Sequence, residues 1–266
     1  MGNHQETQSV PATGNPVAGK LFIGIPIYGG VDPHFFCSIL QFNEEKHRLP
    51  FPVHCSTVIG DSLVSRARNT ITMEFLKSDC THLLMIDSDL VFSSDHVVRI
   101  MGHNLDVVGG FYPKKKDGDA ELVFNSLQDV VMDERGLTEV NYIGTGFLCV
   151  SRKVIEAMIS EYGDDIIFKV DGAENKVGFD FWPVGVYKYP DGSRRYLSED
   201  WYFCQRARDL GFKVWGDNRV LLKHSGNALY PLKHQEQQIF GKPVGDTPAP
   251  TIPEMAASPR LSPVTT

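Results

Sequence analysis

Residues 62–92 read SLVSRARNTITMEFLKSDCTHLLMIDSDLVF, and this stretch decides the fold class. Its first part has the roughly 3.6-residue spacing of a helix, with Ile71 and Phe75 on the inner side. The apolar run HLLMID follows and predicts a strand. Because a helix that leads into an apolar strand is the repeating pattern of sheets covered by helices, the stretch predicts an α/β fold.

The same alternation continues along the chain and predicts a mixed, mainly parallel central sheet flanked by helices. Residues 172–197 interrupt it with a segment rich in Gly, aromatic and charged residues. Ser93 or Ser94 is expected to cap one helix, and Gly211 to end another. Strands are predicted at residues 20–28, 52–60, 82–87, 106–112, 142–152, 213–216 and 219–224, and helices at 62–80, 95–104, 153–163 and 199–212.

Length and composition favour one domain. A chain of 266 residues with 42% hydrophobic and 22% charged residues can bury one substantial core. Residues 1–18 are polar with Gly and Pro, and residues 241–266 are rich in Pro, Ser and Thr, which predicts a disordered tail at each end. The folded domain is therefore expected to span residues 19–240.

Charge and cysteine content exclude several classes of protein. A formal net charge of -7 argues against non-specific binding of nucleic acid, which needs a basic face. The five cysteines are scattered and form no C-x-x-C pair, so reduced thiols and a cytoplasmic location are expected. Since no apolar run approaches the roughly 18 residues that a membrane helix needs, no integral membrane segment is expected.

Asp87 and Asp89 stand one residue apart at the end of a predicted strand and flank Ser88. Side chains at i and i+2 of an extended backbone point to the same side, so both carboxylates can converge on one small volume. Two carboxylates held so close repel unless a cation lies between them, and oxygen ligands suit Mg²⁺ or Mn²⁺. The alternative is a solvated turn, for which Asp and Ser are common residues.

Two downstream features bear on this site. His224 ends the last apolar strand, where a neutral imidazole could complete a metal shell and would favour Mn²⁺, or could be a plain surface or capping residue. Glu199 and Asp200 open a helix, where the helix dipole favours acidic residues. Aromatic residues follow them, and a partly desolvated carboxylate has its pKa raised toward a role as general base. Adjacent helical residues point about 100° apart, so only one is expected to face a reaction centre.

Four segments occur in a characteristic order: SRARNTITMEFLKSDCTHLLMIDSDLVF, YIGTGFLCVSR, SEDWYFCQRARDLGFKVW and KHSG. Together they resemble the GT-A fold glycosyltransferases, nucleotide-sugar-dependent enzymes of the family 2 type. The resemblance implies a GT-A (Rossmann-like) fold, with Asp89 bound directly to the metal and Asp87 against the metal or the donor ribose. It also implies that His224 is a metal ligand and that Asp200, with Glu199 beside it, is the catalytic base of an inverting enzyme.

Similarity to that family also implies that a nucleotide sugar lies over the first strands. The loop after the first strand would wrap the base and ribose, which here means Pro26 and Tyr28. Asp61 and Arg66 follow the second strand and are candidates for contacts to the base or diphosphate. Arg66 and Arg68 are two apart on a helix and do not share a face, so only one should reach the site.

Three further features are candidates for ligand contacts, and each has a plainer explanation. Gly146, with Gly144 in a predicted strand, would leave room beside the sugar or mark a bulge. The lysines at 114–116 form a solvated loop, or a loop that closes over the diphosphate. The aromatic residues of 175–196 suit sugar rings of an acceptor, although a hairpin turning at 190–192 explains the same residues.

These patterns predict a metal-dependent glycosyltransferase. It would move a sugar from a nucleoside-diphosphate sugar to a hydroxyl of a glycan, lipid-linked or other acceptor, with Mn²⁺ or Mg²⁺ as cofactor. SRARN is also similar to mannan polymerase-type mannosyltransferases, which are retaining, so retention is an open alternative to inversion. A nucleotidyl transferase would need a basic Gly-rich loop after the first strand, and IPIYGGVDPHFF has no Lys or Arg. A non-catalytic nucleotide-sugar-binding module is the remaining alternative.

Overall fold

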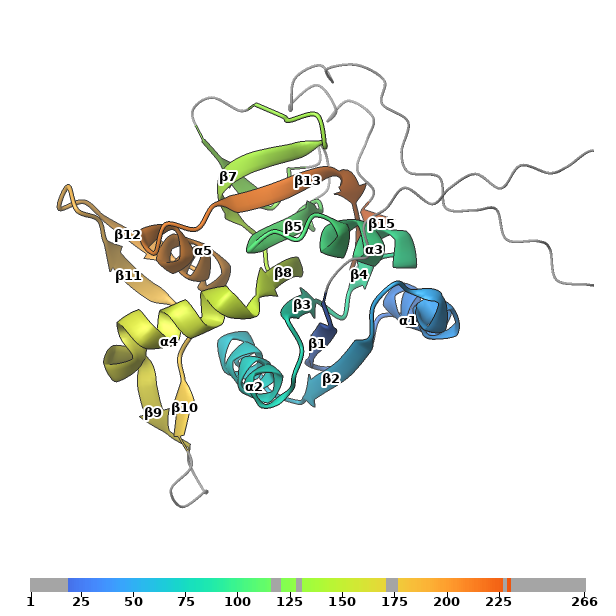
Figure 1. Cartoon of the computed structure of the whole chain (residues 1–266), viewed down its shortest axis with the longest axis horizontal. Coiled ribbons are helices and arrows are strands. Elements are labelled where there is room, and N and C mark those ends of the chain that lie inside the picture. Colours follow the sequence, from blue (N-terminus) through green and yellow to red (C-terminus); the bar gives the residue numbers. More distant parts are fainter. Residues whose placement is uncertain (1–18, 116–120, 128–130, 171–176, 227–228, 231–266) are drawn as a thin grey trace, which may run out of the picture.

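A computed structural model describes residues 19–115, 121–127, 131–170, 177–226 and 229–230. Its centre is an eight-stranded sheet (Figure 1). The strands of this sheet are β1 (Leu21–Ile27), β2 (Val53–Ile59), β3 (His82–Ile86), β5 (Val107–Phe111), β6 (Phe124–Ser126), β7 (Leu137–Ile143), β8 (Phe147–Ser151) and β13 (Val214–Leu221). Their spatial order is β2-β1-β3-β8-β5-β13-β7-β6.

The sheet is mixed, with most strands pointing one way. β1 pairs parallel with β2 and β3, and β5 pairs parallel with β13. β8 runs antiparallel to its neighbours β3 and β5, and β7 runs antiparallel to β13 and β6. The other six of the eight strands therefore share one direction. The predicted α/β fold, with a mixed and mainly parallel sheet flanked by helices, is confirmed.

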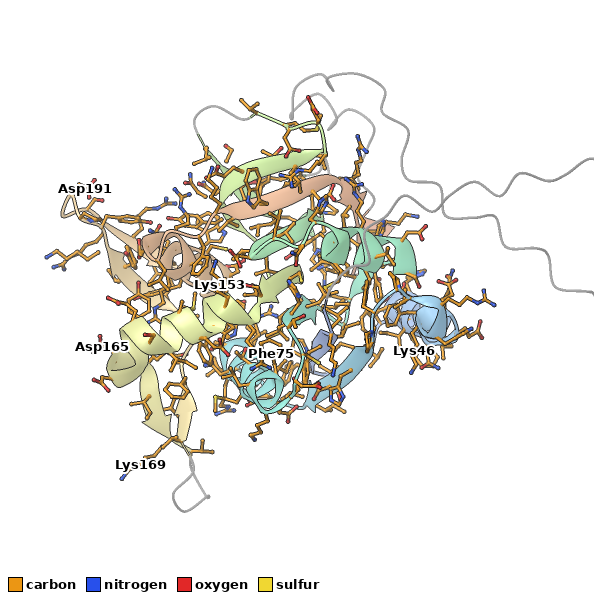
Figure 2. The ribbon with its side chains drawn as sticks, viewed as in Figure 1. Lys46, Phe75, Lys153, Asp165, Lys169 and Asp191 are labelled. Atoms are coloured by element: carbon orange, nitrogen blue, oxygen red, sulfur yellow. The ribbon has the colours of Figure 1, made fainter. Side chains whose placement is uncertain are left out.

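Helices cover both faces because the central strands are apolar on both sides. Leu83 and Met85 of β3 pack into a core cluster with Phe75 of helix α2, which Figure 2 labels beside that helix. Leu84 and Ile86, which alternate with them, pack into a second cluster. This alternation explains why β3 reads as an uninterrupted apolar run. The helices are α1 (Pro33–Glu45), α2 (Val64–Lys77), α3 (Ser94–Gly102), α4 (Arg152–Ile166) and α5 (Glu199–Asp209), with a 3-10 turn at Lys46–Arg48.

Smaller sheets complete the described part of the fold. β9 (Ile167–Lys169) pairs with β10 (Val177–Phe179), and β11 (Gly185–Lys188) pairs with β12 (Arg194–Leu197). The second pair is the hairpin predicted to turn at 190–192. A third sheet joins β4 (Leu90–Val91), β14 (Lys223–Ser225) and β15 (Leu229–Tyr230). In it His224 lies opposite Leu90, so a late segment of the chain reaches the residues that follow Asp89.

Three local predictions were wrong or incomplete. Helix α1 was not predicted, although Pro at its first position and an Asp32 side chain that caps the amides of His34 and Phe35 are ordinary start signals. The segment 142–152 is two strands, since β7 ends at Ile143 and β8 begins at Phe147. The predicted strands 213–216 and 219–224 are instead the continuous β13 followed by β14, because Asp217 is buried against Arg99 and His103 and stays in the strand.

The predicted cap of α3 and the predicted end of α5 are confirmed. Ser93 caps α3 in a capping box, and α5 ends just before Gly211, whose φ of 83° suits glycine. All five cysteines are free. In the described part of the chain, no helix is long and apolar enough to cross a membrane. The predicted tails, Lys116 and residues 231–240 lie outside the described residues, so the boundaries 19–240 stay a prediction.

Candidate functional site

A cavity of about 250 Å³ opens where β1 and β3 end. The segments that follow β1, β2 and β3 line this cavity. They lie together because the carboxyl ends of these parallel strands meet at one edge of the sheet. Its lining residues are Pro26, Ile27, Tyr28, Asp61, Ser62, Val64, Asp87, Ser88 and Asp89. Five of the predicted site residues, Pro26, Tyr28, Asp61, Asp87 and Asp89, therefore lie around one space.

Asp61 and Arg66 form a pair beside this cavity. Arg66 donates to both carboxylate oxygens of Asp61 at 2.8 Å, and the amide of Leu63 donates to Oδ1 at 2.9 Å. These hydrogen bonds, that from Arg66 foremost, lower the pKa of Asp61. The Arg66 side chain is 62% exposed. Asp61 therefore lines the cavity with a fixed carboxylate, whereas the exposed Arg66 that holds it is not one of the lining residues.

Arg68 takes the opposite direction and is buried. Its Nη1 lies 3.0 Å from Oδ1 of Asp87, and its Nη2 lies 3.6 Å from Oε1 of Glu199. Burial lowers the pKa of Arg68, but the two carboxylates outweigh this and raise it above its usual value. The expected divergence of Arg66 and Arg68 is therefore observed. The predicted site residues do not include Arg68. Its position on a different helix face from Arg66 was the sequence signal that could have pointed to a separate role.

Asp89, which directly precedes β4, faces His224 of the neighbouring strand β14. His224 Nε2 lies 3.5 Å from Oδ1 of Asp89, and this oxygen is buried with no hydrogen-bond partner among the described residues. His224 Nδ1 lies 2.8 Å from the carbonyl oxygen of Pro113, which can only accept, so Nδ1 carries a proton. In the neutral ring Nε2 then presents its lone pair to the carboxylate, which is repulsive unless a proton or cation lies between them.

This geometry fits a divalent cation held by two protein side chains. A histidine that donates its other ring nitrogen to a backbone carbonyl is the usual arrangement of a metal ligand. Mg²⁺ or Mn²⁺ commonly takes its remaining positions from phosphate oxygens and water. Asp87, predicted to lie against the metal or the donor ribose, lines the cavity and pairs with Arg68. Within the residues that the structure describes, no group of three or more His, Cys, Asp or Glu side chains is placed to hold a metal.

Lys115 also reaches this pair. Its ammonium group binds Oδ2 of Asp89, the oxygen that His224 does not face. Burial raises the pKa of Asp89, but Lys115, together with His224 when a proton on Nε2 faces Oδ1, outweighs burial and lowers it below its usual value. Asp89 is therefore held ionised, with one oxygen on a lysine and the other turned toward the imidazole.

The first turn of α5 separates its two carboxylates. Glu199 turns toward Arg68, whereas Asp200 accepts hydrogen bonds from the hydroxyl of Ser198 and, at 2.8 Å, from the amide of Trp201. Burial raises the pKa of Asp200, and the charge of Glu199 raises it further. The two residues therefore differ as expected of neighbours on a helix, and Asp200 has the character of a proton acceptor.

Tyr112, which the sequence patterns did not single out, fills the space beside Gly144 and Gly146. A Cβ added to Gly146 would lie 2.8 Å from the Tyr112 ring, and one added to Gly144 would lie 2.1 Å from its hydroxyl. The Tyr112 hydroxyl accepts from the amide of Gly146 at 2.9 Å. The room that Gly146 was expected to leave for a sugar is thus taken by Tyr112. The carbonyl oxygen of Gly146 also accepts a hydrogen bond from the amide of Asp87, which lines the cavity.

No protein-family model matches the chain, and no curated protein matches it. Solved structures similar to it include A197 from STIV, with 17% identity and a TM-score of 0.48 over 80% of this chain and 94% of that one. GalNAc-T7, solved with UDP, GalNAc and Mn²⁺, has 6% identity and a TM-score of 0.45 over 87% of this chain, which spans only 46% of GalNAc-T7.

A glycosyltransferase involved in glycosylation of the major capsid of PBCV-1 has 10% identity and a TM-score of 0.32 over 74% of this chain and 93% of that one. Similar structures thus include glycosyltransferases. With TM-scores below 0.5 and identities of 17% or less, these likenesses assign neither an activity nor a site residue to this chain.

Proposed function

We propose that the chain is a glycosyltransferase that transfers a sugar from a nucleoside-diphosphate sugar to an acceptor hydroxyl in the presence of Mn²⁺ or Mg²⁺. The observation that carries the proposal is the Asp89 and His224 pair, whose facing atoms are 3.5 Å apart beside the cavity at the ends of β1 and β3. Ligands of α/β sheets bind outside the carboxyl ends of their strands. A cation held there would lie beside whatever occupies the cavity.

The cavity supports the nucleotide part of the proposal. Pro26 and Tyr28 offer an exposed wall to a base or ribose, and Tyr28 is 68% exposed. The guanidinium of Arg66 and the ammonium of Lys115 supply positive charge for phosphate oxygens. When bound, the metal would neutralise charge on the departing diphosphate. Asp89 and His224 would hold that cation.

Asp200 is the proposed base. Its raised pKa, caused by burial, makes it a better proton acceptor than an ordinary aspartate. It would take the proton from the acceptor hydroxyl that attacks the anomeric carbon, and the sugar would then be transferred with inversion. The bond from the anomeric carbon to the diphosphate breaks as the new glycosidic bond forms.

A panel of nucleotide sugars tests the proposal. The protein is melted with each donor in buffer with Mn²⁺, with Mg²⁺ or with EDTA, because a ligand of the folded state raises the melting temperature. We expect one donor to stabilise the wild type only with a divalent metal, and the same donor to release its nucleoside diphosphate when an acceptor mixture is added.

Three variants extend the test. D89N and H224A should lose the metal-dependent part of the stabilisation, whereas D200N should keep it and lose turnover. Metal-dependent donor binding by wild-type protein without release of nucleoside diphosphate would favour a non-catalytic binding module. An active D200N enzyme would reject Asp200 as the base and favour a retaining reaction.

A further inference from the structure

We propose that Arg68 is a positioning residue that sets the orientation of Asp200 by holding Glu199 against Asp87. The catalytic meaning of this role rests on the proposed function, and Arg68 is not one of the residues that line the cavity. Arg68 is 3% exposed, and it links α2 to the end of β3 through Asp87 and to the start of α5 through Glu199.

Because Arg68 is buried, its positive charge must be balanced by neighbouring carboxylates. A buried guanidinium is stable only when it is paired, and removal of its partners leaves an uncompensated charge. Asp87 and Glu199 would in turn repel each other without the cation between them. The Nε atom of Arg68 is buried and has no hydrogen-bond partner among the described residues. Both terminal nitrogens bond the Asp87 carboxylate, at 3.0 and 3.5 Å, and Nη2 also lies 3.6 Å from Oε1 of Glu199. Asp87 therefore holds the side chain, and Glu199 extends the link to α5.

The link controls Asp200 through helix geometry. Successive residues of a helix point about 100° apart, so the direction of Glu199 sets the rotation of the first turn of α5 about its axis. With Glu199 drawn inward to Arg68, Asp200 turns to Ser198 and to the amide of Trp201. Lysine cannot replace Arg68, because a single ammonium does not present the planar fork that serves two carboxylates.

Variants of the full chain separate positioning from general destabilisation. R68Q removes the charge, R68K keeps the charge without the fork, and E199Q cuts the link to α5 while leaving Arg68 on Asp87. R99Q is the matched control, because it breaks another ion pair, that of the partly buried Arg99 with the buried Asp217, between α3 and β13. Folding of each variant is checked by circular dichroism and thermal melting, and E199Q keeps the test usable if R68Q does not fold.

Hydrogen exchange gives a readout that does not depend on activity. We expect R68Q, R68K and E199Q to speed exchange of the amides in the first turn of α5, including Tyr202, whose amide bonds the Ser198 carbonyl at 2.8 Å. We expect R99Q to leave these amides unchanged relative to wild type. Equal exchange in all four variants, or no change in any variant at Arg68 or Glu199, would overturn the inference even if the protein transfers no sugar.

Kinetics give the second readout if the wild type has transferase activity. Misplacement of a catalytic group by about 1 Å costs about a hundredfold in rate, so kcat of R68Q should fall about a hundredfold while KM for the donor stays within about threefold. Lost positive charge should also move the acidic limb of the pH profile upward, because Arg68 lowers the pKa of Asp200. Full activity in R68K would show that charge alone suffices and would overturn positioning by the fork. Failure of the wild type on every donor would instead reject the proposed function and leave the exchange result standing.

Discussion

His224 Nε2 lies 3.5 Å from Oδ1 of Asp89, although the two residues come from distant parts of the sequence. Antiparallel pairing of β14 with β4 produces this contact, and the Pro113 carbonyl fixes which ring nitrogen faces the carboxylate. We propose that this buried carboxylate oxygen, which has no hydrogen-bond partner among the described residues, and the imidazole nitrogen that faces it bind a divalent cation. The metal predictions below rest on this pair.

Removal of the imidazole should weaken metal binding. H224A leaves Asp89 with Lys115 alone, so we expect the affinity for Mn²⁺, measured by electron paramagnetic resonance on the free protein, to fall at least tenfold. The expectation follows because even loss of an outer-shell partner of a metal ligand costs about 10–100-fold in affinity. H54A, a change at the distant strand β2, is the control. Unchanged Mn²⁺ affinity in H224A would contradict the assignment of His224 as a ligand.

Loss of Lys115 should have the opposite effect on metal binding. Its ammonium group competes with a cation for Asp89. Because a partly exposed ion pair contributes up to about 1 kcal/mol, K115M should bind Mn²⁺ up to about fivefold more tightly than wild type. K114M removes the same charge from the neighbouring residue, which pairs with Glu121, and should change the affinity less. Weaker Mn²⁺ binding in K115M would show that Lys115 does not compete.

Asp200 should lower the stability of the folded protein while supporting transfer activity. Its pKa is raised in the folded state by burial, so the folded protein holds this proton more tightly than the unfolded chain. The resulting loss of stability is absent below the unfolded pKa near 3.8, grows as the pH rises toward the raised value, and is complete above it.

D200N should therefore unfold at a higher denaturant concentration than wild type at pH 7, with the difference shrinking at pH 3. In the same variant, transfer should fall by about 10²–10⁴-fold, as expected for loss of a general base. Equilibrium unfolding in urea at both pH values measures the first effect, and product release measures the second. A D200N protein less stable than wild type at pH 7 would contradict the account of its pKa.

Gly144 should be intolerant of a side chain because Tyr112 occupies the space. G144A places a Cβ 2.1 Å from the Tyr112 hydroxyl, and such overpacking costs about 1–3 kcal/mol in the free energy of unfolding. G185A is the matched control, since a Cβ there meets nothing within 4 Å. Urea denaturation of both variants measures the difference. Equal stability of G144A and wild type would show that Tyr112 moves aside at little cost.

Sequence patterns predicted strands and helices correctly where the spacing of apolar side chains shows which face is buried. β3 and α2 were predicted because apolar spacing shows directly which faces are covered. The break between β7 and β8 was missed because Gly144 and Gly146 match a strand in spacing, and only the packing of Tyr112 against them explains the interruption. Continuity of β13 was missed because Asp217 looks like a break until Arg99 and His103 are seen to bury it.

The sequence by itself determined the class of fold, the order of the motifs and the gathering of Asp87 and Asp89 at the end of one strand. These follow from short-range spacing of apolar and acidic residues. Tertiary structure alone decided how the acidic residues divide: Asp87 and Glu199 pair with the buried Arg68, whereas Asp89 faces His224. The physical reason is that the partner of a carboxylate is whichever polar or charged side chain lies nearest in space, and here those side chains come from elements far apart along the chain.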